Sequence, residues 1–357
     1  MPVVWTDRHR LHEPKGELWL GVWIEGTEVP ARGERIRQAL DEAGAAFVDP
    51  RAYNDAPFEA VHDPAFLSFL ANAYDEWVAG GYLDEPGQDR VVPYVFPLPQ
   101  LTSGRAPRRP TAASARTGMF AMDTMTLIGP GTWEAARAVA EAALTAADLV
   151  ADGTPAAYAV CRPPGHHVGR DFYGGSCYLN NAAIAAQRLR SHGIPGVGII
   201  DLDAHHGNGT QEIFYRRADV VYASVHVDPG AGWFPHFVGY GDETGDKEGE
   251  GANLNLPMPP GTGDSVWLEA VGRLTRFVAE RDIGAVVVSL GVDAARDDPE
   301  SPLQVTVDGY AEAGRLVAGL GLPTVFVQEG GYHLDSLGQL VLATLLAFEG
   351  EKRERHD

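Results

Sequence analysis

Short runs of β-branched and apolar residues alternate along the chain with longer amphipathic segments, a pattern typical of a parallel sheet covered by helices. Strands are expected at residues 157–161, 197–201, 220–226, 285–290 and 324–328. Several of these runs are apolar on both faces, as expected for strands in the middle of a sheet that is buried from both sides. Helical spacing of apolar residues predicts helices over 132–152, 181–191, 264–280 and 334–348. We therefore expect an α/β fold, with a central, mostly parallel sheet flanked by helices on both faces.

The N-terminal third is less regular. A helix is expected from Asp63 to Trp77, and Thr306 is a candidate cap for a later helix. Residues 93–110 are rich in proline and should form a loop, and residues 104–117 hold four arginines and no acidic residue. We interpret this basic segment as a solvated surface loop, with a partner-binding loop or lid as the alternative. No repeat or low-complexity tract is present, so residues 1–357 are treated as one domain with an extended loop region at about 83–117.

The composition narrows the classes of partner. The 357 residues include 28 Lys and Arg against 49 Asp and Glu, a formal charge of −21, which argues against nucleic acid. That charge is compatible with a cationic substrate, although solubility alone explains it equally well. Two cysteines, Cys161 and Cys177, are too few for a disulfide framework or a thiolate zinc site. Neither a signal-peptide pattern nor an apolar window of about 18 residues is seen, so a cytoplasmic protein with no membrane partner is expected.

Polar residues that are costly to bury follow four of the predicted strands, at the sheet edge where α/β proteins build their sites. Asp203 and His205 are two residues apart, so in extended chain both side chains point to one side. Asp293, at the end of a separate strand, can supply a third ligand. Two carboxylates and one imidazole suit Zn²⁺, Fe²⁺ or Mn²⁺, with an open position for water. An Asp-x-His pair alone would equally suit a structural hydrogen-bond cluster.

Two adjacent histidines, His166 and His167, follow a Pro-Pro-Gly turn and could be metal ligands or acid–base groups. Asp201 and Asn208 offer the acceptors that fix imidazole tautomers. Tyr332 follows two glycines, which free the backbone to project the phenol into a pocket, where it would suit an oxyanion as a neutral donor. Taken alone, each of these is more often a structural residue, so the interpretation rests on their combination.

Four blocks resemble the histone deacetylase superfamily, whose members share the arginase-like α/β fold, and they occur in the family's order. They are Pro-Gly-His-His at 164–167, Asp-Leu-Asp-Ala-His-His-Gly-Asn-Gly-Thr-Gln at 201–211, Ser-Leu-Gly-Val-Asp at 289–293 and Glu-Gly-Gly-Tyr at 329–332. The resemblance spans about residue 105 to the C-terminus. The segments 128–135, 233–240 and 243–245 are most similar to the bacterial acetylpolyamine amidohydrolase branch.

This resemblance implies roles for the candidate residues. Asp203, His205 and Asp293 would bind one zinc ion, with Fe²⁺ as the alternative. His167 would be the general base for water, His166 its electrostatic or acid partner, and Tyr332 the donor to the tetrahedral oxyanion of an amide under hydrolysis. The resemblance also implies structural K⁺ or Na⁺ sites. One would use the side chains of Asp201 and Ser224 with carbonyls of Asp203, His205 and Val225, and the other carbonyls near Phe214, Arg217 and Val220.

The resemblance further implies a substrate channel. Phe234 matches one of two aromatic walls, whereas Ser176 stands where the family usually has the other, which should widen or polarise that wall. Gly175 and Gly330 are expected beside it. The acidic residue that polyamine-specific members place before Ile128 has no clean match, because Met125 lies there; Asp123 is the nearest candidate.

The favoured function is thus a zinc-dependent deacetylase of acetylated polyamines or similar small amines, and the alternative is a protein or peptide lysine deacylase. A binuclear-manganese ureohydrolase of the same fold would need carboxylates at positions 207 and 291, which are both glycine. A catalytically inactive binding protein would normally have lost one of the ligands, the histidine pair or Tyr332. Homodimerisation through about residues 83–116 is a further expectation from the resemblance.

Overall fold

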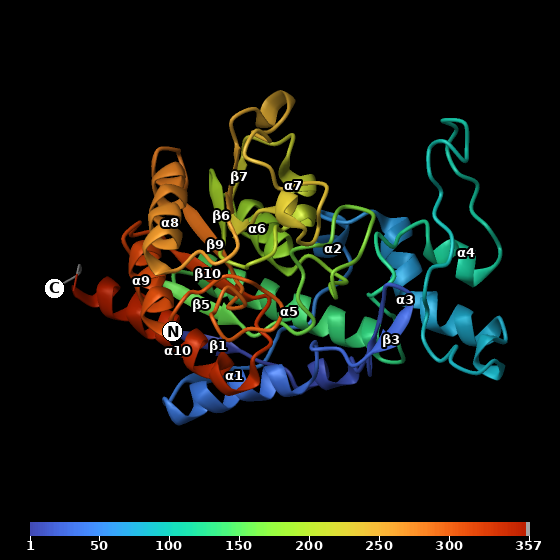
Figure 1. Ribbon diagram of the computed structural model, residues 1–357. Helices are drawn as coiled ribbons and strands as arrows, with labels where there is room; N and C mark the ends of the chain where they lie inside the picture. Colours follow the sequence, from blue (N-terminus) through green and yellow to red (C-terminus); the bar gives the residue numbers. More distant parts are fainter. Residues whose placement is uncertain (355–357) are drawn as a thin grey trace.

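The computed structural model describes residues 1–354, and its centre is an eight-stranded sheet in which every pair of neighbouring strands is parallel (Figure 1). The strand order is β4-β1-β5-β10-β9-β6-β7-β8. The strands are β1 (Pro2–Val4), β4 (Ala46–Val48), β5 (Ala156–Ala159), β6 (Val197–Asp201), β7 (Val220–Val227), β8 (Asn253–Met258), β9 (Ala285–Leu290) and β10 (Thr324–Gln328).

Helices cover both faces of this sheet. The α-helices are α1 (Ala31–Glu42), α2 (Ala56–Glu59), α3 (Pro64–Ala79), α4 (Ala113–Thr117), α5 (Thr132–Ala151), α6 (Asn181–Ser191), α7 (Asn208–Phe214), α8 (Asp264–Ala279), α9 (Val307–Ala318) and α10 (Leu334–Glu354). One hydrophobic core joins α3, α5 and α6 to strand residues such as Ile199 and Val287. A second core joins α1, α8, α9 and α10 to the next residues along the same strands, Ile200 and Val288. Successive strand residues thus enter opposite cores, which is why these strands are apolar on both faces.

The predicted α/β architecture is confirmed, and strands 197–201, 285–290 and 324–328 have the expected bounds. The two N-terminal caps lie where expected: Asp63 accepts a hydrogen bond from the Ala65 amide, and Thr306 from the Gly309 amide. The three strands β1, β4 and β8 were not anticipated. In the part of the chain that the structure describes, no helix is both long and apolar enough to cross a membrane.

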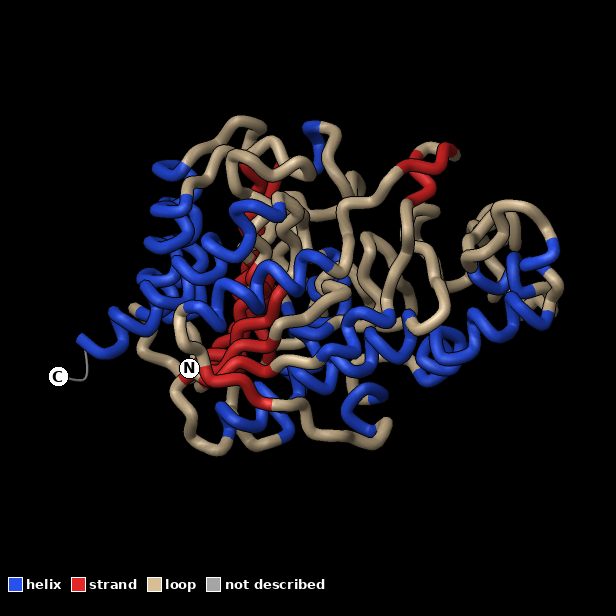
Figure 2. Tube along the Cα trace, turned by 90° about the horizontal axis from the view of Figure 1, so that it is seen from below, coloured by secondary structure: helices blue, strands red, loops and turns tan. Residues whose placement is uncertain are grey.

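Two features extend away from the sheet and its helices. Strands β2 (Glu17–Trp19) and β3 (Val22–Ile24) form an antiparallel hairpin that does not join the central sheet (Figure 2). Residues 93–110 contain only turns and irregular backbone, as their proline content predicts, and this loop projects beside α3 and α4 in Figure 1. The hairpin matters for function, because it supplies a wall of the cavity described below.

The strands that precede the candidate site residues are the four central neighbours β5, β10, β9 and β6. Their carboxyl ends therefore meet at one edge of the sheet, where the register pairs Asp201 with Ser289 and Gln328 with Leu290.

Candidate active site

Three potential metal ligands converge at this edge. Asp203 and His205 follow β6 and Asp293 follows β9, and one ligand atom from each lies within 4.8 Å of the others. His205 Nδ1 is 2.9 Å from Asp293 Oδ2 and 3.3 Å from Asp203 Oδ1. Sequence separation between β6 and β9 is large, so their adjacency in the sheet is what assembles this group.

Backbone amides fix the orientation of both carboxylates. The Ala204 amide donates to Asp293 Oδ1 at 2.7 Å, and the Gly330 amide donates to Asp203 Oδ2 at 2.7 Å. Both aspartates are buried, and burial together with the nearby Asp203 charge raises the pKa of Asp293 to about 7. Two buried carboxylates held this close repel each other unless a cation lies between them. The donor set of two carboxylates and one imidazole therefore fits a divalent ion of the Zn²⁺ or Fe²⁺ type.

The adjacent histidines lie beside this group in two different environments. His166 Nδ1 is 3.1 Å from Asp201 Oδ2, and its Nε2 is 3.8 Å from Asp203 Oδ1. Burial opposes a charge on His166, but the two carboxylates outweigh it and raise its pKa to about 10. For His167, burial and then the neighbouring His166 charge hold the pKa well below its usual value. At neutral pH the pair thus combines one imidazolium with one neutral imidazole, an arrangement suited to divided acid and base roles.

The tautomer of His167 follows from its partner. His167 Nδ1 lies 2.7 Å from Asn208 Oδ1, an oxygen that only accepts hydrogen bonds. Nδ1 therefore carries the proton and Nε2 has a free lone pair. The ring of Phe234 stands at 89° to the His167 ring with centroids 4.8 Å apart, which confines the imidazole from another side.

Tyr332 is held by a residue that the sequence analysis missed. The guanidinium of Arg32, a buried residue of α1, lies 4.4 Å above the Tyr332 ring. Arg32 also donates to the carbonyls of Gly331 at 2.6 Å and Glu329 at 2.7 Å, and pairs with Glu28. Burial raises the pKa of the Tyr332 phenol well above 10 despite the opposing Arg32 charge. The phenol is therefore a neutral hydrogen-bond donor.

A cavity of about 630 Å³ gives access to these groups. His167, His205 and Tyr332 line it, together with three of the predicted channel residues: Gly175, Ser176 and Phe234. Ser176 adopts a left-handed backbone conformation, with φ of 60°, and its amide donates to Thr126 Oγ1 at 2.9 Å. Its small side chain puts no aromatic ring on the cavity wall at this position.

Three carboxylates also line this cavity: Glu17, Glu25 and Glu300. Glu17 belongs to β2 and Glu25 follows β3, so the hairpin brings them to the cavity, while Thr27 donates a hydrogen bond to Glu300 at 2.7 Å. None was among the predicted site residues. No local sequence signal marks them, because their position depends on how the hairpin packs.

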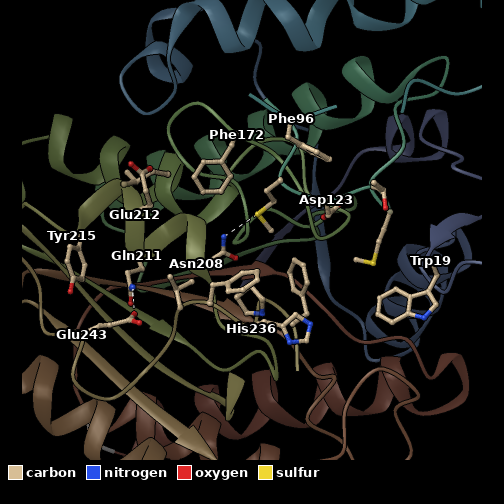
Figure 3. A pocket seen from close by; sticks show the side chains of 18 of the residues that line it. Trp19, Phe96, Asp123, Phe172, Asn208, Gln211, Glu212, Tyr215, His236 and Glu243 are labelled. Carbon is tan, nitrogen blue, oxygen red and sulfur yellow. Dashed lines mark hydrogen bonds between the residues drawn. The ribbon is translucent and has the colours of Figure 1, made fainter. Parts of the chain in front are cut away.

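The remaining predicted site residues are Gly330, Asp123 and the members of the two expected cation groups, and none of them lines the 630 Å³ cavity except His205. Gly330 packs against the metal group, where an added Cβ would lie 2.5 Å from Asp293 Oδ2. Asp123 lines a neighbouring cavity of about 1050 Å³ (Figure 3), and its Oδ2 accepts from the Gly175 amide at 2.6 Å, so it holds the turn before Ser176. Asp201 and Ser224 are register partners on β6 and β7. Of the second expected cation group, Phe214 ends α7, Val220 begins β7, and Arg217 lies in the connection between them.

Comparison with known proteins gives consistent matches. The family model described as histone deacetylase domain matches residues 26–348. The chain is 42% identical to the acetylpolyamine amidohydrolase of Mycoplana ramosa, over 98% of this chain and 100% of that protein. It is 43% identical to the acetylpolyamine amidohydrolase of Burkholderia pseudomallei, over 92% of each chain. A crystal structure of the acetylpolyamine aminohydrolase from Burkholderia pseudomallei superposes with a TM-score of 0.92 at 40% identity, covering 98% of this chain and 99% of that one.

Proposed function

The chain belongs to the histone deacetylase domain family, and on that basis we propose that it hydrolyses the acetyl amide of an acetylated polyamine or a similar small cationic amine. The observation that carries this proposal is the 630 Å³ cavity, whose lining includes the candidate metal ligand His205 and Tyr332 together with the carboxylates of Glu17, Glu25 and Glu300. An acetamide at one end and an ammonium group at the other would meet complementary chemistry along this cavity. The relatives named acetylpolyamine amidohydrolase support the same substrate class.

Asp203, His205 and Asp293 would hold one Zn²⁺ or Fe²⁺ ion. When bound, such an ion polarises an amide carbonyl and lowers the pKa of water to about 7. The backbone amides of Ala204 and Gly330 would keep the two carboxylates aimed at that position. The two carboxylates would balance the charge of the divalent ion and the neutral histidine would add none, so the site would carry no net charge and the ion would stay electrophilic.

His167 is proposed as the general base. His167 lines the cavity, and its Nε2 lone pair is free because Nδ1 is committed to Asn208. It would take the proton from the attacking water. His166, protonated beside Asp201, would stabilise the negative charge that develops on the carbonyl oxygen and limit the basicity of its neighbour. The imidazole pair then supplies the proton that the leaving amine needs before it departs.

Tyr332 is proposed as the oxyanion donor. Its neutral phenol lines the cavity with His205, and the Arg32 guanidinium over its ring fixes its plane. Donation from the hydroxyl to the developing oxyanion stabilises the transition state more than the planar amide.

The proposal includes further elements that the same resemblance implies. We infer a single deacetylase domain over residues 1–357, structural K⁺ or Na⁺ sites at the residues named above, homodimerisation through about residues 83–116, and a cytoplasmic location. The runner-up activity is deacylation of lysine in proteins or peptides.

A deacetylation panel with metal analysis on the same preparation tests the function. The substrates are N-acetylputrescine, acetylspermidines, an acetyl-lysine peptide and N-butylacetamide, an uncharged analogue of acetylputrescine that lacks the terminal amino group. We expect kcat/KM to be largest for the acetylated polyamines and one divalent ion per chain. Equal or larger kcat/KM on the acetyl-lysine peptide would favour the protein deacylase, and no turnover of any acetamide by metal-loaded protein would refute amide hydrolysis.

A further inference from the structure

Glu243 has no role in the proposed chemistry, but it binds two segments that contact the proposed base, His167. Glu243 lies in the loop after Tyr240 and lines the 1050 Å³ cavity, not the cavity that holds Tyr332 and His205 (Figure 3). Its Oε2 accepts from the Gly239 amide at 2.9 Å and from Gln211 Nε2 at 2.6 Å, while Oε1 is 3.2 Å from the Gly239 amide. These bonds join two separate segments, α7 and the 232–240 loop.

The first connection runs through α7 to the partner of the base. Gln211 lies three residues after Asn208 in the same helix, so the two residues lie about one turn apart. Asn208 Oδ1 in turn accepts from His167 Nδ1 at 2.7 Å. The bond from Gln211 to Glu243, drawn as a dashed line in Figure 3, therefore anchors the helix that sets the His167 tautomer.

The second connection runs through Gly239 to the aromatic wall. The loop that ends at Gly239 begins near Gly232 and carries Phe234, whose ring packs edge-on against His167. Gly239 has φ of 106°, and an added Cβ would lie 2.7 Å from the His206 ring, so this backbone turn is closely packed. The Gly239 carbonyl is also bound, at 2.7 Å from His226 Nε2. His226 therefore binds the carbonyl of Gly239, and Glu243 binds its amide.

We propose that Glu243 is a positioning residue for His167, acting through Gln211 and Asn208 on one side and through Gly239 and Phe234 on the other. It does not touch the reacting atoms. It holds together the acceptor that fixes the His167 proton and the ring that confines His167, so that Nε2 faces the cavity. This inference rests on the proposed function, because it concerns the base of that reaction.

The expected effect is a loss in kcat with little change in KM. Replacing Glu243 by Ala frees α7 and the loop to shift, and a displacement of about 1 Å at a catalytic group lowers turnover by up to about 100-fold. We expect Glu243→Ala to lower kcat on N-acetylputrescine by on the order of 10- to 100-fold, while KM changes by less than about threefold, because the carboxylates that would bind the ammonium lie in the other cavity. Glu243→Gln should recover most of the rate, because its carbonyl oxygen can replace Oε2 as acceptor for the Gly239 amide, Gln211 Nε2 and Asn255 Nδ2.

A double-mutant cycle with Asn208→Ala separates positioning from general loosening of the structure. Because Glu243 acts through Asn208 on one of its two sides, Glu243→Ala should cost less in the Asn208→Ala background than in the wild type. Rates are expressed per bound metal ion, so that lost metal or inactive protein does not count as lost turnover. The matched control is Glu212→Ala, since Glu212 lines the same cavity and also accepts a backbone hydrogen bond, from the Arg170 amide at 2.9 Å, but has no bond to Gly239. It should retain wild-type kcat.

Several outcomes would overturn the proposal: a Glu243→Ala enzyme as fast as wild type, the same fold-loss in both backgrounds, a Gln variant as slow as the Ala variant, or an equal loss in Glu212→Ala. Should Glu243→Ala fail to fold, Glu243→Asp replaces it in the cycle, because the shorter side chain keeps the charge but withdraws the acceptor. Wild-type protein that turns over no acetylated amine refutes the proposed function instead, so the two failures are distinguishable.

Discussion

Glu17 provides a test of how the cavity would select a cationic substrate. The residue lies in β2, half-buried on the cavity wall. Burial, followed by the charge of Glu300, raises the pKa of its carboxyl to about 7. Between about pH 6 and about pH 8 the ionised fraction therefore rises from about one tenth to about nine tenths. An aliphatic ammonium stays protonated across this range, since its pKa is near about 10.

The size of the effect follows from this geometry. An ammonium and a carboxylate about 4 Å apart attract by about 4 kcal/mol at an effective dielectric constant of about 20. Desolvation and the partial exposure of Glu17 reduce the net gain to about 1 kcal/mol, which corresponds to roughly a fivefold change in KM. Because only about eight tenths of the carboxyls ionise across this range, KM for N-acetylputrescine should fall roughly threefold as the pH rises from about 6 to about 8.

The assay compares two enzymes and two substrates. In Glu17→Gln the fall in KM should disappear, with KM near the wild-type value at about pH 6 and raised at about pH 8. N-butylacetamide lacks the ammonium, so its KM should show no such dependence in either enzyme. The reasoning is refuted if Glu17→Gln retains the fall in KM, or if the uncharged substrate shows the same fall.

Three further predictions concern the phenol, the metal group and the stability of the fold. Tyr332→Phe should lower kcat by about 10²- to 10³-fold without changing the metal content or the melting temperature, because the ring against Arg32 is retained; an unchanged rate would exclude the oxyanion role. Dialysis against dipicolinate should abolish turnover, and Zn²⁺ at about 100 times its Kd should restore it and stabilise the fold by about 2.7 kcal/mol, whereas full activity in metal-free protein would contradict a metal site. Burial lowers the pKa of His62 to about 4, so the stability tied to its neutral form is present above about pH 6.5 and is lost as the pH falls towards about 4. His62→Gln should reduce the loss of unfolding free energy between about pH 7 and about pH 4.5 by roughly 2 kcal/mol in urea titrations, and an unaltered pH dependence would contradict this assignment.

The central strands were predictable because a strand that is buried on both faces is a continuous run of apolar residues, and such runs are visible in the sequence. In Ala285–Leu290 every side chain is buried, and a run of that kind has few alternatives to a central parallel strand. The outer strands lack this signal. β1 and β4 have only three residues each, and β8 includes Asn253 and Asn255, whose amides bond to Gln211. Such short or polar strands are defined by the neighbours they pair with, which a local pattern does not contain.

The same distinction separates the predicted site residues from those that were missed. Asp203, His205 and Asp293 follow strands that the pattern already places in the sheet, so their convergence could be inferred. Arg32 reaches Tyr332 across about 300 residues of sequence, from a helix whose own pattern gives no sign of this contact. Glu17 depends in the same way on the packing of a hairpin that stands apart from the sheet.

The glycines around the candidate metal ligands leave no room for the extra carboxylates of a binuclear site. A binuclear site of the ureohydrolase type would need a carboxylate at position 291, but a Cβ on Gly291 would lie 2.1 Å from Asp203 Oδ2, closer than any real contact. At position 207 a Cβ would lie 2.3 Å from Asp201 Oδ2 and 2.6 Å from the Tyr222 hydroxyl. Both side chains are buried and bound by other groups, Asp203 Oδ2 by the Gly330 amide and Asp201 Oδ2 by His166 and Tyr222. They cannot move aside without breaking the bonds that orient the remaining ligands. With the present ligand geometry, a carboxylate side chain does not fit at either position. Substitution at these two positions alone is therefore incompatible with the fold and would not create a binuclear site.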